Sequence, residues 1–205
     1  VMMGADQTRS GRSIWTAIAT VVSVQLAVLG YIVFDRVRLL SAGREIVLDV
    51  VPVDPRSLFR GDYVILSYDI SQISSALLEG KLAKGAPLFV TIGQDAADKW
   101  HVSRVGAEMV VPATPEAGTA PAGKQVVLKA RSDAWRSPAI GDRTSPIFAR
   151  YGIESYFVPE GQGRALEKLV GEKKIKAVVA VGRDGTAALK GLMVDGKLVY
   201  REPLI

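Results

Sequence analysis

The chain lacks cysteine and asparagine altogether, and His101 is the single histidine among its 205 residues. Without cysteine it has no disulfide, no thiol nucleophile and no cysteine-bound metal. Without asparagine it has no acceptor for N-glycosylation. His101 falls in the run KWHVSRV, which is typical of a strand, so serine–histidine catalysis and a multi-histidine metal site gain little support. We therefore expect neither a metal nor a cofactor.

Charge is absent from one long stretch, because Ser13–Phe34 carries no charged residue over 22 consecutive positions. As a helix rising about 1.5 Å per residue it would reach roughly 33 Å, enough to cross a hydrocarbon core of about 30 Å. Trp15 and Tyr31 lie near its two ends, where their rings favour the headgroup region. We expect a single retained membrane anchor. A removed signal peptide, whose apolar region is usually about 7 to 15 residues long, and a buried core helix are the weaker alternatives.

The charges beside this stretch leave its orientation open. Two arginines precede it and three follow it closely, so the positive-inside rule does not decide which end is cytoplasmic. A long domain after an anchor can be translocated whatever its charge. We expect a cytoplasmic tail at residues 1–12, the transmembrane anchor at 13–35 and one extracytoplasmic domain at 44–205.

Small side chains line one face of the expected anchor helix. They fall within about 80° of one another on a helical wheel. They are Thr16, Ala19, Ser23, Ala27 and Gly30. Such a face lets a second helix approach closely, and the amide of Gln25, on roughly the opposite side, needs a hydrogen-bond partner in lipid. We predict packing against a multispan membrane protein, although small residues and one glutamine also occur in anchors without such a partner.

The remainder of the chain is patterned mainly as strands. Alternating or β-branched runs predict about eight or nine strands, and residues 74–84 and 163–172 predict one or two short helices. The Asp195-Gly196 pair suits a type I′ hairpin. Residues 106–124, rich in proline, alanine and glycine, predict a surface loop. We expect a mainly β (α+β) domain, either a partly open barrel or a folded sheet.

The run GDYVILSY at residues 61–68 matches every fixed position of the pattern Gly-Asp-Tyr-x-x-Leu-x-Tyr. The surrounding run VDPRSLFRGDYVILSYDI at 53–70 and the block RYGIESYFVPEGQG at 150–163 extend the likeness. Together they resemble the GDYXXLXY family of bacterial proteins over residues 44–205. The resemblance implies an anchor in the bacterial inner membrane and a β-rich periplasmic domain. It brings no established activity.

Two interpretations of the motif residues stay open. In the structural one, Leu66 and Tyr68 face the core, the tyrosine hydroxyl finds a partner, and arginines pair with Asp62 and Glu154. In the functional one, two chain segments line a shared groove for a peptide, a glycan or a partner loop. The candidate groove residues are Arg56, Arg60, Gly61, Asp62, Tyr63, Tyr68, Tyr151, Glu154, Tyr156 and Glu160.

A membrane-tethered hydrolase is the alternative function. A proline-rich turn, a Gly-Asp pair and an apolar strand are similar to the core of signal-peptidase-like Ser/Lys proteases. Those enzymes place their serine about eight or nine residues before the Gly-Asp pair, where this chain has Pro52 and Val53, and Ser57 lies only four residues before Gly61. A carboxylate-based site would need acidic groups without arginine partners.

Net charge is +5, but the chain shows no nucleic-acid-binding module, so we expect no nucleic-acid partner. The sequence favours a single-pass accessory or binding protein without catalytic activity, working beside a multispan membrane protein. Its features are one anchor, one β-rich domain and no recognisable catalytic constellation.

Overall fold

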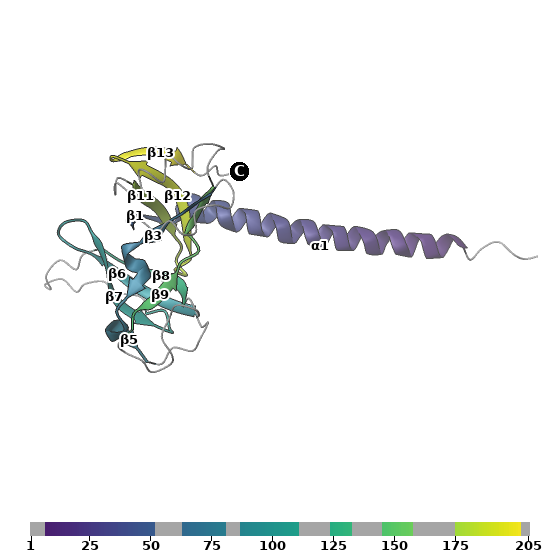
Figure 1. Cartoon of the computed structure of the whole chain (residues 1–205). Coiled ribbons are helices and arrows are strands. Elements are labelled where there is room, and N and C mark those ends of the chain that lie inside the picture. The colour runs from purple at the N-terminus through teal and green to yellow at the C-terminus, as the bar shows by residue number, and fades with distance from the viewer. Residues whose placement is uncertain are drawn as a thin grey trace, which may run out of the picture.

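The structure is a computed structural model in which one long helix leads into a β-rich domain (Figure 1). It describes residues 7–51, 63–80, 87–110, 124–132, 145–157 and 175–201.

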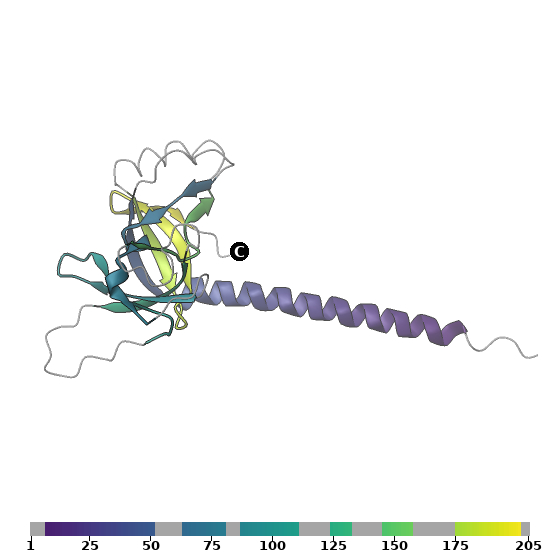
Figure 2. The ribbon, with the colours of Figure 1, turned by 60° about the horizontal axis from the view of Figure 1, so that its bottom comes forward.

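Helix α1 (Gln7–Ala42) runs unbroken for 36 residues and projects away from the domain (Figures 1 and 2). Its part from Ile14 to Ala42 is long and apolar enough to cross a membrane, and within it an 18-residue window has a mean hydropathy of 2.2 and is not buried by the rest of the described protein. Large apolar side chains point outward, and Trp15 and Phe34 are 72% and 64% exposed. Because a helix satisfies its own backbone hydrogen bonds, only these side chains meet the surroundings.

Two larger sheets and one two-stranded sheet make up the domain. The five-stranded sheet has the order β13 (Lys197–Arg201), β12 (Ala187–Val194), β11 (Ile175–Val181), β1 (Arg44–Val51) and β3 (Ser67–Tyr68). The six-stranded sheet has the order β4 (Gln72–Ile73), β9 (Ile147–Arg150), β8 (Gln125–Ser132), β6 (Pro87–Gln94), β7 (Trp100–Gly106) and β5 (Leu78–Glu79). The third pairs β10 (Ser155–Phe157) with β2 (Tyr63–Ile65). Two single-turn 3-10 helices, η2 (Asp69–Ser71) and η3 (Ser75–Leu77), interrupt the strands.

The predicted mainly β architecture after one apolar helix is confirmed. The sheets are open and do not close into a barrel, so the folded-sheet form of the prediction applies. All pairings are antiparallel except that of β5 with β7. The hairpin between β12 and β13 turns through Asp195 and Gly196, whose φ angles of 49° and 79° are those that a type I′ turn requires.

One hydrophobic core joins the two larger sheets. Alternate residues of β1, among them Ile46 and Leu48, are buried together with Leu88 and Val90 of β6 and Val179 of β11. Side chains of a strand alternate between its two faces, so each strand gives one face to this shared interior. A backbone bond from the Lys129 N–H to the Gly185 oxygen, 2.7 Å long, also ties β8 to the turn between β11 and β12.

The helix meets the domain without a linker. Leu40, near the end of α1, is buried, and α1 contacts β11 and β12. The Gly43 N–H donates to the Leu39 oxygen at 2.9 Å, and β1 begins at the next residue, Arg44. A Cβ atom at Gly43 would lie 2.4 Å from the Leu39 oxygen and 3.1 Å from Ala180 Cβ. Glycine therefore permits the close turn from helix into strand.

Four sequence-based expectations differ from the structure or fall outside the described residues. The alternating run DYVILSYDI at 62–70 predicts one continuous strand, but its described part is divided into β2, β3 and η2, because β2 and β3 pair with different strands. The helix expected at 74–84 is, over residues 74–80, a 3-10 turn followed by β5. The helix expected at 163–172 and most of the loop expected at 106–124 lie outside the described residues.

Candidate functional site

The motif segment crosses from one sheet to another at the middle of the domain. Its first described residues, Tyr63–Ile65, pair with Ser155–Phe157 in the two-stranded sheet. The Leu66 N–H then donates to the Glu154 backbone oxygen at 2.7 Å. Ser67 and Tyr68 leave this partner and pair with the end of β1. The described parts of the motif and of the later block, residues 63–68 and 150–157, therefore lie side by side.

Two tyrosines, one from each of these segments, donate hydrogen bonds to the backbone of the other segment. The Tyr68 hydroxyl donates to the Ile153 backbone oxygen at 2.6 Å, and the Tyr151 hydroxyl donates to the Ile70 backbone oxygen at 2.6 Å. We call these four residues, Tyr68, Ile70, Tyr151 and Ile153, the tyrosine clasp. All four are buried. Because a buried hydroxyl or carbonyl without a partner is costly, each bond holds its segment in register.

Glu154 organises the turn within this clasp. Its carboxylate accepts hydrogen bonds from the backbone N–H groups of Tyr151 and Gly152, the second at 2.9 Å. Gly152 has a φ of 80°, which favours glycine. The carboxylate thus closes the turn from Tyr151 to Glu154. This turn places the Ile153 oxygen where the Tyr68 hydroxyl can donate to it. A carboxylate engaged by two backbone donors is suited to structure more than to proton transfer.

The two tyrosines of the clasp titrate far from their usual range. Burial raises the pKa of Tyr68 and of Tyr151 well above the ordinary value of 10.0, and the negative charge of nearby Glu154 raises both further. Both effects oppose formation of a phenolate. The hydroxyl groups therefore remain hydrogen-bond donors at any physiological pH.

Five of the ten groove residues proposed from sequence lie among the described residues, and the other five do not. Tyr68, Tyr151 and Tyr156 are buried, and the Tyr156 ring stands edge-on to Tyr200 with centroids 6.3 Å apart. Glu154 is partly exposed, and Tyr63 is placed through its backbone pairing with Phe157. Arg56, Arg60, Gly61, Asp62 and Glu160 lie outside the described residues, as do the proline-rich turn and Ser57. Ligand binding by this set stays a prediction.

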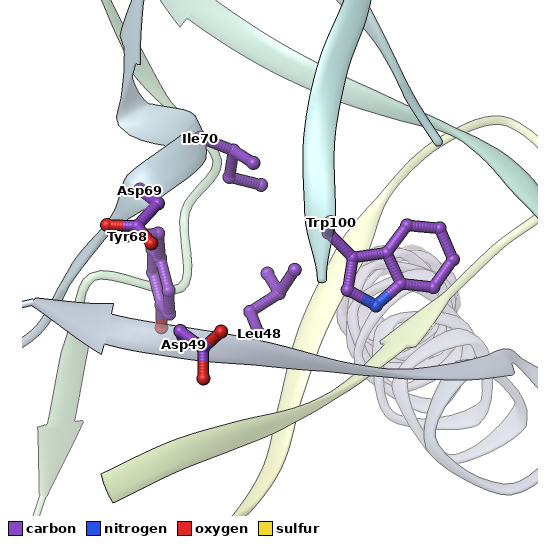
Figure 3. A pocket seen from close by; sticks show the side chains of 6 residues that line it. All are labelled: Leu48, Asp49, Tyr68, Asp69, Ile70 and Trp100. Carbon is purple, nitrogen blue, oxygen red and sulfur yellow. The ribbon is translucent and has the colours of Figure 1, made fainter. Parts of the chain in front are cut away.

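A small pocket that the sequence did not indicate opens beside the clasp (Figure 3). It has a cavity volume of about 10 Å³ and is lined by Leu48, Asp49, Tyr68, Asp69, Ile70 and Trp100. Tyr68 and Asp69 lie on one side of it and Trp100 on the other, with Leu48 and Asp49 between them on β1. Such a volume suits about one water molecule. Asp49 also forms an ion pair with Lys176 at 3.2 Å.

The described residues hold no group of three or more histidine, cysteine, aspartate or glutamate side chains that could bind a metal ion. His101 lies exposed on β7, with its ring beside Gly93 of the neighbouring strand. This is the strand position that the sequence predicted for it.

The helix-packing residues all lie on the freely projecting part of α1. Thr16, Ala19, Ser23, Gln25, Ala27 and Gly30 are all exposed. The Thr20 hydroxyl donates a hydrogen bond to the Thr16 backbone oxygen at 2.9 Å. The Thr20 side chain therefore needs no hydrogen-bond partner from outside the helix. Helix packing by this face stays a prediction.

The fold and this central site define a class of protein: a β-rich domain on an apolar helix compatible with a single membrane anchor, with Leu66 and Tyr68 of a tyrosine-bearing motif buried in the core. The model of the GDYXXLXY family, described as GDYXXLXY protein, matches residues 25–192. The chain therefore belongs to the GDYXXLXY family, a family of unknown function. Comparison with curated proteins and with solved structures found no match.

Proposed function

We propose that this chain is a single-pass, membrane-anchored accessory protein of the bacterial inner membrane. Its helix packs beside a multispan membrane protein, and its β-rich domain lies on the periplasmic side. One observation carries this proposal: the apolar side chains of α1 from Ile14 to Phe34 are exposed along its whole length. Exposed apolar surface of this extent is stable only against lipid or another protein.

A role as a partner, rather than an enzyme, fits the chemistry at the centre of the domain. The Glu154 carboxylate is occupied by backbone donors, and the hydroxyls of Tyr68 and Tyr151 are occupied by carbonyl oxygens. The pocket beside them has room for about one water molecule. These groups serve the fold, so we assign the domain a binding or positioning role.

The anchor supplies the contact with the multispan protein in this proposal. Ala19, Ser23 and Ala27 give a smooth face against which a second helix can pack closely, and the Gln25 amide provides a hydrogen bond that only a partner can return inside lipid. The absence of a linker then holds the domain directly beside that partner's outer surface.

A gentle-detergent pull-down of the full-length protein with mass spectrometry tests the proposal. We expect a stoichiometric multispan protein that is lost when both Ala19→Leu and Ala27→Leu are introduced. The matched control is Ala17→Leu with Val24→Leu, which lie between the small-residue face and Gln25 on the helical wheel and should retain the partner. Equal recovery from both double variants would contradict packing through the small-residue face.

A separate test determines on which side of the membrane the domain lies. Its result is unambiguous because the chain has no cysteine of its own that could react. A single cysteine at Ala97, in the exposed β6–β7 turn, should react with a membrane-impermeant maleimide in spheroplasts, whereas one at Ser10 should react only after lysis. The reverse pattern would place the domain in the cytoplasm.

A further inference from the structure

Three segments of the domain lie at the end of α1 or directly beside the residues that contact it. The turn after β11 lies against the helix, because a Cβ atom at Gly182 would be 3.2 Å from Leu39 Cδ1. Strand β8 follows, held to that turn by the bond from the Lys129 N–H to the Gly185 oxygen. At the other end of β8, the Arg44 guanidinium donates to the Gln125 oxygen at 2.8 Å. The surface around the helix exit is therefore built from β1, β8 and the β11–β12 turn.

This surface is rich in exposed cationic side chains. We call them the junction collar: Arg36, Arg38, Arg44, Lys129 and Arg183. None forms an ion pair with another described residue. The same region has two carboxylates, Asp35 and Asp184. The second accepts hydrogen bonds from the Thr186 hydroxyl and N–H, and these bonds lower the pKa of Asp184.

The position of the collar along α1 matches the headgroup layer of a bilayer. The uncharged stretch ends at Phe34, and Leu39, which contacts the β11–β12 turn, follows five residues later. At about 1.5 Å per residue that is about 8 Å further along the axis. Headgroup regions extend about 5 to 8 Å beyond each side of the hydrocarbon core. The helix therefore brings the collar to the depth of the lipid phosphates.

We propose that the junction collar docks the β-rich domain onto an anionic phospholipid surface, with Lys129 and Arg183 as the domain's own contacts. The inference rests on the proposed membrane anchoring and adds the lipid class that the domain recognises. Charge complementarity carries it, because basic side chains near an anionic bilayer favour binding by about fivefold per charge. Salt weakens such attraction as the Debye length shortens.

The test uses the full-length chain reconstituted into phosphatidylcholine bilayers. Trace amounts of spin-labelled phosphatidylglycerol or phosphatidylcholine then report the relative association of each lipid with the protein. Wild type should prefer phosphatidylglycerol, and 0.5 M salt should reduce that preference. In the variant with Lys129→Gln and Arg183→Gln, the preference for phosphatidylglycerol should be at least twofold lower than in wild type. The largest effect expected is about fivefold for each charge removed.

A matched control removes the same charge elsewhere. Lys176 and Lys197 lie at the end of the five-stranded sheet opposite the helix exit, since Ile175 pairs with Val194 whereas Val181 pairs with Arg44. The variant with Lys176→Gln and Lys197→Gln should keep the wild-type preference. All four side chains are exposed, and the ion pair of Lys176 with Asp49 that the control removes is a surface pair of small energetic weight, so thermal unfolding should show all three proteins folded.

Three outcomes separate the two proposals. A preference that falls only in the Lys129/Arg183 variant supports the collar. A preference that is absent in wild type, or unchanged in that variant, overturns the collar while leaving the anchor in place. Failure of the chain to enter the bilayer overturns the membrane anchoring, and the collar with it.

Discussion

At the tyrosine clasp, two hydroxyl groups buried inside the domain find their hydrogen-bond partners in the same chain, whereas from Ile14 to Phe34 of α1 the large apolar side chains are not covered by the described part of the protein. The clasp satisfies its polar groups internally because water cannot reach them. The apolar surface of the helix, by contrast, is exposed to whatever surrounds the protein. The comparison teaches that Leu66 and Tyr68 of the family motif are built into the core of the domain, whereas the helix presents apolar surface that we propose is covered by lipid and a partner.

Removing a ring from the clasp should give the largest contrast between the two regions. Tyr68→Ala deletes a fully buried aromatic side chain and should lower the free energy of unfolding of the domain by about 3 to 5 kcal/mol. Leu26→Ala on α1 should change it by less than about 0.5 kcal/mol, because that side chain is exposed. Urea unfolding of the full-length protein in detergent measures both. Similar losses of unfolding free energy in Tyr68→Ala and Leu26→Ala would contradict the contrast between the clasp and the helix.

Removing only the hydroxyl groups should have a smaller effect. Tyr68→Phe leaves the Ile153 oxygen without its donor, and Tyr151→Phe does the same to the Ile70 oxygen, so each should cost about 1 to 3 kcal/mol. Tyr31→Phe on α1 is the matched control and should cost nothing measurable, since its side chain is exposed.

The same variants, combined, show whether the two bonds act together. Because both join the same two segments, the double variant should depart from additivity by about 0.5 kcal/mol or more. Strict additivity would mean that the two bonds hold their segments independently.

Alkaline pH should weaken the clasp gradually. The folded protein holds the pKa of Tyr68 and Tyr151 above the ordinary value of 10.0, so the unfolded chain loses these protons first as pH rises. Their contribution to stability is complete below pH 10 and declines above it, by about 1.4 kcal/mol per pH unit for each tyrosine.

Unfolding free energies measured between pH 8 and 11 test this prediction. The Tyr68→Phe/Tyr151→Phe variant should show a flatter decline above pH 10 than wild type, since it no longer carries the two groups. Parallel declines would assign the effect to other groups.

A different kind of effect is expected where the two regions meet. Gly43→Ala would bring a Cβ atom to 2.4 Å from the Leu39 backbone oxygen and 3.1 Å from the buried Ala180 Cβ, so the last turn of α1 should shift. The free energy of unfolding should fall by about 0.5 to 3 kcal/mol, because backbone atoms cannot turn aside as a side chain can. The distance distribution between spin labels at positions 34 and 197 should also broaden. Gly30→Ala, where a Cβ atom would meet nothing within 4 Å, should leave that distribution unchanged.

Local patterns in the sequence predicted much of the fold. The uncharged stretch predicted α1, and the strands at the C-terminal end followed from alternation and from the Asp195-Gly196 turn. Alternation also placed Leu66 and Tyr68 on the core side, where both are buried. Each of these predictions depends only on neighbouring residues, for which periodicity is informative.

What the sequence could not predict depends on distant pairings. The motif strand is divided because Tyr63–Ile65 pairs with β10 while Tyr68 pairs with β1, and periodicity within one strand carries no information on its partner. The partner of the Tyr151 hydroxyl lies 81 positions away along the chain. The pocket beside Trp100 likewise forms only when β1, η2 and β7 come together.

The passage from α1 to β1 through Gly43 alone limits how far the domain can travel. A flexible linker would let a tethered domain search a volume that grows with linker length, but here one residue separates helix from strand. The domain therefore moves with its helix. With α1 in the membrane, as proposed, the domain would diffuse in two dimensions, and its search for a membrane-embedded partner would be confined to that plane.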